Sequence, residues 1–313
     1  MTPLSDLLLS IVPVDSIPAH LKSYIPGVSP FSTWPVVAAV ITSYLGFIFT
    51  AREFVKDLPS LKLQTLFKFH NALLSAGSLV LLLLIMEEVA SVWMNVGHYD
   101  SVCAPSSWTD RLEFYYMVNY YFKYYEFLDT LFLVLKKKPL TFLHVFHHAS
   151  TALLAFVQLN GKLSPSWTVI SINLLVHVVM YYYYYASAGG AKFWVTTHTS
   201  DKLSLTITTQ WKKYLTIMQI IQFIIDLFVF YFGLYQHYVH KYFPAFPHFG
   251  DCSGSEPAAL FGCALLTSYL LLFLDFYMYT YIKAPFSKAK ANGTSQTMVP
   301  NRNSHTYAPR PST

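Results

Sequence analysis

Seven apolar segments, each long enough to cross a membrane, constrain the fold of this 313-residue chain more than any other feature. A hydrocarbon core of about 30 Å needs roughly 20 apolar residues in a helix. The predicted spans are 33–51, 66–93, 113–135, 140–159, 166–187, 211–236 and 257–282. Only 12% of the residues are charged, against about 25% in soluble domains. The sequence therefore predicts an all-α integral membrane protein.

The segments around these spans predict a domain plan and an orientation. Residues 1–32, with five prolines, predict a loose or interfacial tail, residues 33–283 a membrane domain, and residues 284–313 a disordered polar tail. Sixteen Lys and Arg fall in the segments on one side, against four on the other (Lys22, Arg111, Lys162 and Lys241). Under the positive-inside rule the C-terminus is cytosolic and the N-terminus is not. The net charge of +5 follows from these loops and does not indicate a nucleic-acid partner.

Two further features lie between the spans. Cys103 and Cys252 fall on the same non-cytosolic side, where an oxidising lumen favours a disulfide, with two free thiols as the alternative. Residues 195–209 predict a polar, Thr-rich loop without an assigned role.

Histidines form a polar stripe inside the fourth span. His144, His147 and His148 stand at i, i+3 and i+4, which places them on one face of a helix. Imidazole acts as a base, a nucleophile or a metal ligand. Three imidazoles on one buried face are hard to explain by packing alone, so they predict a functional site.

The neighbouring spans carry further polar stripes that predict a shared interior site. These candidates are Lys123, Glu126 and Asp129 in the third span, Asn173, His177 and Tyr181 in the fifth, and Gln219 in the sixth. Ionisable residues within a membrane are expensive and usually functional. For Glu126 and Asp129 a structural ion pair with neighbouring helices is the alternative.

Two chemistries fit such a stripe. A di-iron site, as in membrane desaturases and hydroxylases, needs about eight histidines, and only four cluster inside the spans. Acyl transfer through an imidazole nucleophile needs fewer. A third reading, a lipid receptor or transporter, fits the topology but gives no reason for the histidines.

Four motifs make the chain resemble a known family. They are K-Y-Y-E-F-L-D-T (123–130), L-H-V-F-H-H (143–148), N-L-L-V-H-V-V-M-Y (173–181) and T-I-M-Q-I-I-Q-F (216–223). In this order and spacing they resemble the ELO family of long-chain and very-long-chain fatty acid elongases, and most of all its fungal branch. The resemblance implies seven helices, six of them forming a barrel around a central acyl tunnel.

The resemblance also implies a reaction, the 3-oxoacyl-CoA synthase condensation of acyl-CoA with malonyl-CoA. His147 would carry the acyl group, His177 would act from across the tunnel, and His144 and His148 would assist. Substrate would be positioned by Lys123, Glu126, Asp129, Asn173, Tyr181 and Gln219, and the CoA phosphates bound by Lys137, Lys138 and Lys213, lysines that positive-inside topology explains equally well. No metal or cofactor beyond the CoA carriers is expected.

The family further implies a multi-pass protein of the endoplasmic reticulum membrane. Expected partners are membrane lipid, the ketoreductase, dehydratase and enoyl reductase of the elongation cycle, and a second copy in a homodimer. The sequence leaves the acyl chain length open.

Overall fold

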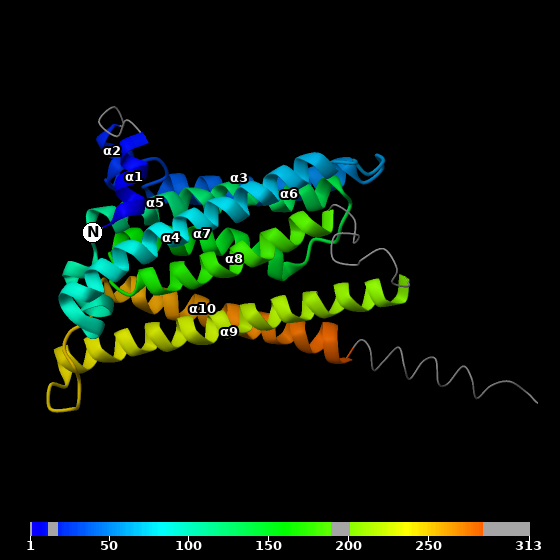
Figure 1. Cartoon of the computed structure of the whole chain (residues 1–313). Helices are drawn as coiled ribbons and strands as arrows, with labels where there is room; N and C mark the ends of the chain where they lie inside the picture. Colours follow the sequence, from blue (N-terminus) through cyan, green and yellow to red (C-terminus); the bar gives the residue numbers. More distant parts are fainter. Residues whose placement is uncertain (1, 12–17, 189–200, 284–313) are drawn as a thin grey trace, which may run out of the picture. The chain divides into compact units, whose positions relative to one another are not determined.

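The computed structural model describes residues 2–11, 18–188 and 201–283, apart from the side chains of residues 201–209. Every regular element in these ranges is helical, as predicted. The long elements are α3 (Trp34–Val55), α4 (Gln64–Cys103), α5 (Asp110–Tyr125), α6 (Phe127–Leu135), α7 (Phe142–Gly161), α8 (Ser166–Ala188), α9 (Asp201–Tyr242) and α10 (Glu256–Tyr277). Figure 1 shows these helices side by side.

Six of the described helices are long and apolar enough to cross a membrane, namely α3, α4, α7, α8, α9 from residue 210, and α10 with its extension. The prediction of an all-α integral membrane protein is therefore confirmed. The third predicted span, 113–135, corresponds to α5 and α6, which are too short to count separately. They follow each other through Glu126, whose amide donates to the Phe122 carbonyl at 2.8 Å.

The chain divides into two compact units, Met1–Phe273 and Leu274–Thr313. In the first unit, α4 packs on α8, α5 on α7, and α8 on α9, while α3 lies against α6 and α7. This packing turns the polar stripes of α5 to α9 toward one another. In the second unit, the end of α10 continues into a π-helical turn, Met278–Lys283.

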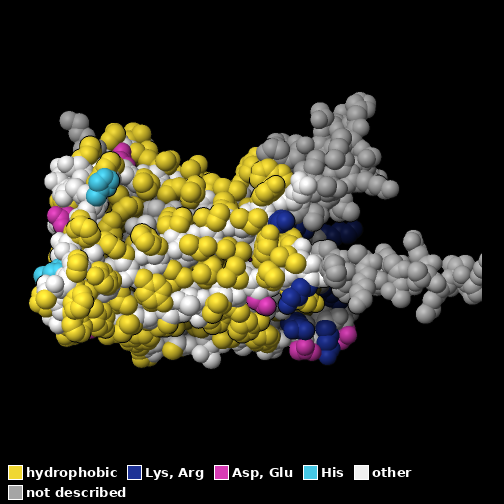
Figure 2. Space-filling model, turned by 90° about the horizontal axis from the view of Figure 1, so that it is seen from below, with side chains coloured by type: hydrophobic (Ala, Val, Ile, Leu, Met, Phe, Trp, Pro, Cys, Tyr) yellow, Lys and Arg dark blue, Asp and Glu magenta, His cyan; other side chains and the backbone are white. Residues whose placement is uncertain are grey.

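Hydrophobic side chains cover the outside of the helices. Figure 2 shows one face where they form a band, with Lys and Arg gathered at one end. Large exposed members include Leu79, Leu83 and Phe228. Contiguous apolar surface of this kind marks a membrane or protein interface, and here it matches the lipid contact expected of the spans.

The described part of the N-terminal segment, predicted to be a loose or interfacial tail, is helical. It contains α1 (Pro3–Ile11) and α2 (Ala19–Lys22). The Glu87 carboxylate on α4 accepts the amides of Leu4 and Ser5 at 2.7 and 2.9 Å. These amides belong to the first turn of α1, where unpaired N–H groups favour an anion.

The predicted loop 195–209 also differs from the structure. Helix α9 begins at Asp201, so residues 201–209 are helical, and residues 195–200 lie outside the described residues. The Thr- and Ser-rich composition of this segment suggested a loop. Such residues disfavour helices only weakly, so composition alone did not reveal that the helix begins at Asp201.

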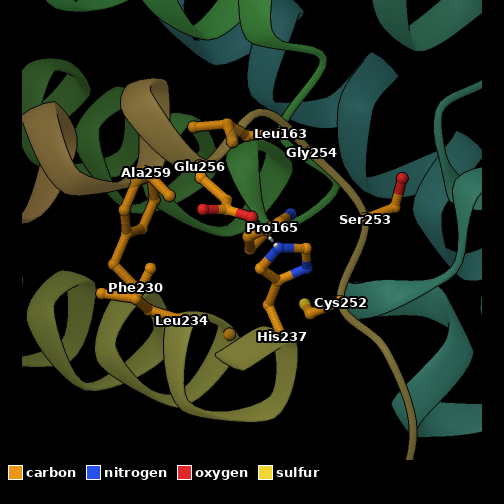
Figure 3. Close-up of a pocket in the computed structure, with 11 residues that line it drawn as sticks. Leu163, Pro165, Phe230, Leu234, His237, Cys252, Ser253, Gly254, Glu256 and Ala259 are labelled. Atoms are coloured by element: carbon orange, nitrogen blue, oxygen red, sulfur yellow. Dashed lines mark hydrogen bonds and ion pairs between the residues drawn. The ribbon is translucent and has the colours of Figure 1, made fainter. Parts of the chain in front are cut away.

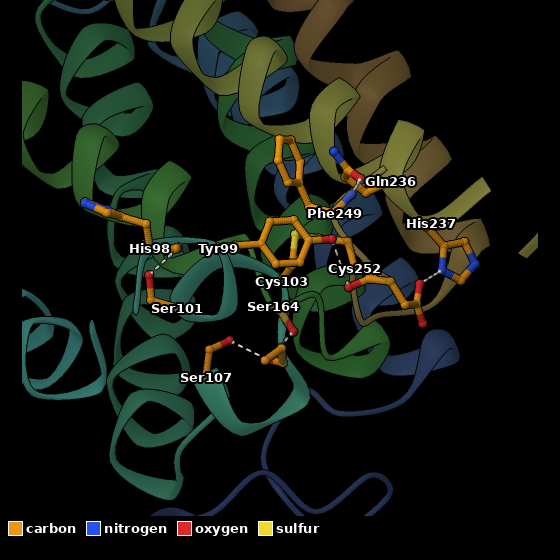
Figure 4. Close-up of a disulfide and its surroundings, with 12 residues drawn as sticks. His98, Tyr99, Ser101, Cys103, Ser107, Ser164, Gln236, His237, Phe249 and Cys252 are labelled. Atoms are coloured by element: carbon orange, nitrogen blue, oxygen red, sulfur yellow. Dashed lines mark hydrogen bonds and ion pairs between the residues drawn. A yellow bond between two sulfur atoms is a disulfide. The ribbon is translucent and has the colours of Figure 1, made fainter. Parts of the chain in front are cut away.

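A disulfide between Cys103 and Cys252 joins the end of α4 to the segment 243–255 that connects α9 and α10 (Figure 4). We call this side of the molecule the disulfide end. Ser253 donates its amide to the Cys103 carbonyl at 2.8 Å, and the Tyr99 hydroxyl donates to the Asp251 carbonyl at 3.2 Å. The connection is therefore held by both covalent and hydrogen bonds.

Candidate functional site

A buried ionic array links α5, α8 and the junction at Glu126. Lys123 Nζ donates to Glu126 Oε1 at 3.0 Å and to Asn173 Oδ1 at 2.9 Å. His177 Nδ1 lies 3.2 Å from the same Glu126 oxygen, and its Nε2 lies 3.5 Å from Asn173 Nδ2. Lys123, Glu126 and His177 are each at most 4% exposed. The structure thus brings four of the predicted residues together, and each charge has an opposite partner as burial requires.

Asp129 forms a second buried group next to this array. Its two carboxylate oxygens bind separate partners, His70 Nε2 at 2.8 Å and the Tyr181 hydroxyl at 2.6 Å. Tyr181 was predicted at the site, but His70 was not, because it stands alone at the start of α4. The sequence signal that could have identified His70 is a histidine at a position that the helical periodicity of α4 buries.

The histidine stripe of α7 begins with a hydrogen-bonded chain from α3. The Tyr44 hydroxyl lies 2.7 Å from Thr130 Oγ1, which lies 3.0 Å from His144 Nε2. The rings of His144 and His148 are 4.4 Å apart. His144 is therefore oriented by α6 and α3, and His148 packs against it as the i, i+4 spacing predicts.

His147 lies deeper than His144 and lines a narrow cavity among α5, α7, α8, α9 and α10. The other lining residues are Asn119, Lys123, Thr151, Leu154, Ala155, Gln158, Val169, Ile170, Asn173, Gln222, Phe223, Asp226, Leu266 and Tyr269. Its imidazole packs 5.0 Å from the Tyr269 ring, and no described residue forms a hydrogen bond with it. His147 thus keeps its ring nitrogens for a ligand.

The cavity is too small for an acyl chain in this state. Its volume is about 30 Å³, and one water needs roughly 10–15 Å³ on the same measure. The cavity therefore has room for about two water molecules. Binding a long acyl chain requires the lining side chains to move apart.

Besides Lys123, four almost fully buried polar side chains line this cavity and were not predicted as site residues, although Gln222 lies in the T-I-M-Q-I-I-Q-F motif (216–223). They are Asn119 on α5, Gln158 on α7, and Gln222 and Asp226 on α9, each at most 4% exposed. Gln222 donates to Asp226 at 3.3 Å. The predicted Gln219 instead contacts Met180 Sδ at 3.6 Å and does not line the cavity. The sequence signals were the helical steps from Lys123 back to Asn119 and from Gln222 to Asp226.

The predicted CoA-binding lysines are exposed near the opposite end from the disulfide. Lys137 Nζ donates to the Lys56 carbonyl at 2.7 Å, which ties the α6–α7 connection to α3. Lys138 and Lys213 are exposed. Their neighbour Lys136 lies 3.4 Å over the Phe67 ring, and partial burial lowers its pKa, with the Lys138 charge adding to the effect.

A charged cluster outside the polar array surrounds His237 at the disulfide end (Figure 3). Its Nδ1 lies 2.7 Å from Asp251 and its Nε2 3.1 Å from Glu256, which also pairs with Lys241. The cluster borders a second small pocket next to Cys252. Since both ring nitrogens are bound by carboxylates, His237 fastens the segment 243–255 to α9 and α10.

The chain matches one family model over residues 29–289, that of the ELO family, described as the GNS1/SUR4 family. This range contains all seven predicted spans and every residue of the polar array.

Relatives match over most of their length. "Putative fatty acid elongase 1" of Schizosaccharomyces pombe is 45% identical over 92% of this chain and 83% of its own. "Fatty acid elongase A" of Dictyostelium discoideum is 34% identical, covering 85% and 90% of the two chains. "Very long chain fatty acid elongase 2" of Rattus norvegicus is 30% identical, covering 82% and 84%.

Proposed function

This chain belongs to the ELO family of fatty acid elongases, and from that premise we propose that it is a very-long-chain 3-oxoacyl-CoA synthase. It condenses a long-chain acyl-CoA with malonyl-CoA and releases CO2 and CoA. One observation carries the proposal. His147 lines the interior cavity together with Lys123 and Asn173, and its ring has no hydrogen-bond partner among the described residues. A nucleophile needs such an unoccupied nitrogen facing the substrate.

In the first half-reaction His147 attacks the acyl-CoA carbonyl. A C–N bond forms, the thioester C–S bond breaks, and the imidazole proton goes to the departing CoA thiolate. His144 and His148 assist this transfer, since the ring of His148 packs against both His144 and His147.

In the second half-reaction malonyl-CoA loses CO2 and its C–C electron pair becomes an enolate. The enolate attacks the acyl carbon, the C–N bond breaks, and a proton from the medium restores His147. Lys123 and Asn173 supply hydrogen-bond donors for the developing oxyanion, and Glu126 orients His177. Preorganised donors of this kind stabilise charge in a dry site.

The setting of the enzyme is part of the same proposal. It is a multi-pass protein of the endoplasmic reticulum with a luminal N-terminus and a cytosolic C-terminus, supported by the excess of Lys and Arg on one side. The Cys103–Cys252 disulfide supports an oxidising compartment at that end. CoA binds at Lys137, Lys138 and Lys213, no other cofactor takes part, and the product passes to the other enzymes of the elongation cycle.

The di-iron alternative fits the described residues less well. His70 and His177 lie against carboxylates, and His144 against Thr130. Within the described ranges no three His, Cys, Asp or Glu side chains converge with the geometry of a metal site. Acyl transfer needs these hydrogen-bonded histidines as they are.

The test is formation of the acyl-enzyme. Purified protein incubated with acyl-CoA and no malonyl-CoA gains the mass of one acyl group, and peptide mass spectrometry locates it on His147. His147→Ala loses this adduct and lowers condensation by at least about 10³-fold. The exposed His98→Ala provides the matched control and keeps both activities. Condensation that survives in His147→Ala overturns the mechanism, whereas iron-dependent desaturation supports the alternative.

A further inference from the structure

An apolar groove lies on the outside of the bundle, away from the polar array, between α1, α4 and α5. Its volume is about 610 Å³, within the roughly 300–1,000 Å³ typical of ligand sites. The residues that line it are Ser5, Leu8, Lys22, Ala76, Gly77, Val80, Leu81, Leu84, Asp110, Arg111, Phe114, Tyr115, Val118 and Phe122. Leu8 and Val80 are 38% and 44% exposed, so the groove is open to the surroundings of the helices.

The length of the groove corresponds to one leaflet of a bilayer. Helix α5 lines it from Asp110 to Phe122. Twelve residues at about 1.5 Å each give roughly 18 Å, and half of a hydrocarbon core is about 15 Å. At its inner end Gly77 lets the Phe122 ring pack closely on α4, since a side chain at Gly77 would meet that ring. A single extended acyl chain therefore fits along it.

Charged residues of both signs lie at the other end of the groove, near the disulfide end. Lys22 has no ion-pair partner among the described residues. Arg111 has two acidic neighbours, Asp6 at 3.3 Å and Glu88 at 3.9 Å. Asp110 is exposed at the same end. This combination of cation and anion complements a zwitterionic headgroup better than a purely anionic one.

We propose that the groove binds one zwitterionic phospholipid from the leaflet at the disulfide end. One acyl chain lies along α4 and α5 against Val80 and Phe122. The phosphate binds Lys22 and Arg111, and the headgroup ammonium binds Asp110. The N-terminal segment completes the site through Leu8 and Lys22, which gives α1 and α2 a role apart from the proposed condensation site.

The first test is lipid retention. The full-length chain is reconstituted with equal amounts of phosphatidylcholine and phosphatidylglycerol, washed with mild detergent, and analysed by native mass spectrometry. The expected result is one phosphatidylcholine per chain. Retention of phosphatidylglycerol, of a free fatty acid or acyl-CoA, or of no lipid overturns the proposal.

Two pairs of variants locate the bound lipid. Val80→Trp fills the groove and should abolish retention, whereas Val36→Trp, at a valine equally exposed on α3, should retain lipid like the wild type. Lys22→Gln should weaken retention about tenfold, the loss of one charge-assisted hydrogen bond. Lys56→Gln, at an exposed lysine outside the groove, should not. Equal retention in Val80→Trp and Val36→Trp, or in the two lysine variants, contradicts the proposed site.

Discussion

The buried carboxylate of Glu126 contacts two neighbours, the cationic Lys123 and His177, which is cationic when protonated. It accepts from Lys123 at 3.0 Å and lies 3.2 Å from His177 Nδ1. Lys123 has no other carboxylate within ion-pair distance among the described residues. Loss of the Glu126 charge would therefore leave a buried ammonium without an anion, which costs far more than the pair itself contributes.

Glu126→Gln is expected to destabilise the protein by about 3 kcal/mol and to lower condensation, because Lys123 stays buried and unpaired. Thermal unfolding in detergent and the condensation assay measure the two effects. Glu53→Gln provides the matched control, since Glu53 forms an exposed i, i+3 pair with Lys56 that is worth at most about 0.5 kcal/mol. Similar melting temperatures for the two variants would contradict a role for the Glu126 charge.

Side-chain type and spacing predicted which residues meet in the array, but not all of its members. Lys123, Asn173 and His177 come together because each stripe follows one face of a helix. Gln219 and Gln222 recur at steps of three on α9, and Gln219 was chosen as the site residue, yet it is Gln222 that lines the cavity. Which of the two glutamines faces the cavity depends on the rotation of α9 about its own axis against Met180 and α8. Periodicity within one helix does not determine that rotation.

Helices α3, α7 and α8 were predictable as whole elements, because a long apolar segment is enough to identify each of them. The break between α5 and α6 was not, because no Pro or Gly marks it. The folding of α1 was not predicted either, since its N-terminus is capped by Glu87, more than 80 residues away in sequence. Contacts of such sequence separation leave no local pattern.

The disulfide binds the end of α4 to the segment between α9 and α10, across 149 residues. A cross-link over a long loop stabilises by about 2–5 kcal/mol. Reductant is therefore expected to lower the melting temperature of the wild type, and the double variant Cys103→Ala, Cys252→Ala should melt at that lower temperature with or without reductant.

Cys263→Ala tests whether the response to reductant comes from the disulfide or from the free thiol of Cys263. Cys263 is a buried free cysteine in α10, so its variant should keep the full response to reductant. A double variant that still responds would show that the reductant acts on something other than the Cys103–Cys252 disulfide.

The proposed function requires the helices around the cavity to move apart before an acyl chain can bind there. Acyl-CoA should therefore raise the melting temperature more as its chain lengthens, and CoA alone should raise it little. A ligand at 100 times its Kd adds about 2.7 kcal/mol. Ala155→Leu, which adds a larger side chain to the cavity wall, should reduce the acyl-dependent part. An equal rise with CoA and long-chain acyl-CoA would contradict binding of the chain in this cavity.

The separation of Cys103 and Cys252 also has a consequence for biosynthesis. A ribosome that adds about 5–20 residues per second needs roughly 7–30 s to make the 149 residues between the two cysteines. During that interval Cys103 has no disulfide partner within its own chain and, in the proposed luminal setting, can mispair with other thiols. The cross-link can close only after α4 to α9 and the following segment have been translated, so the disulfide is a late step of assembly that marks chains synthesised at least as far as Cys252.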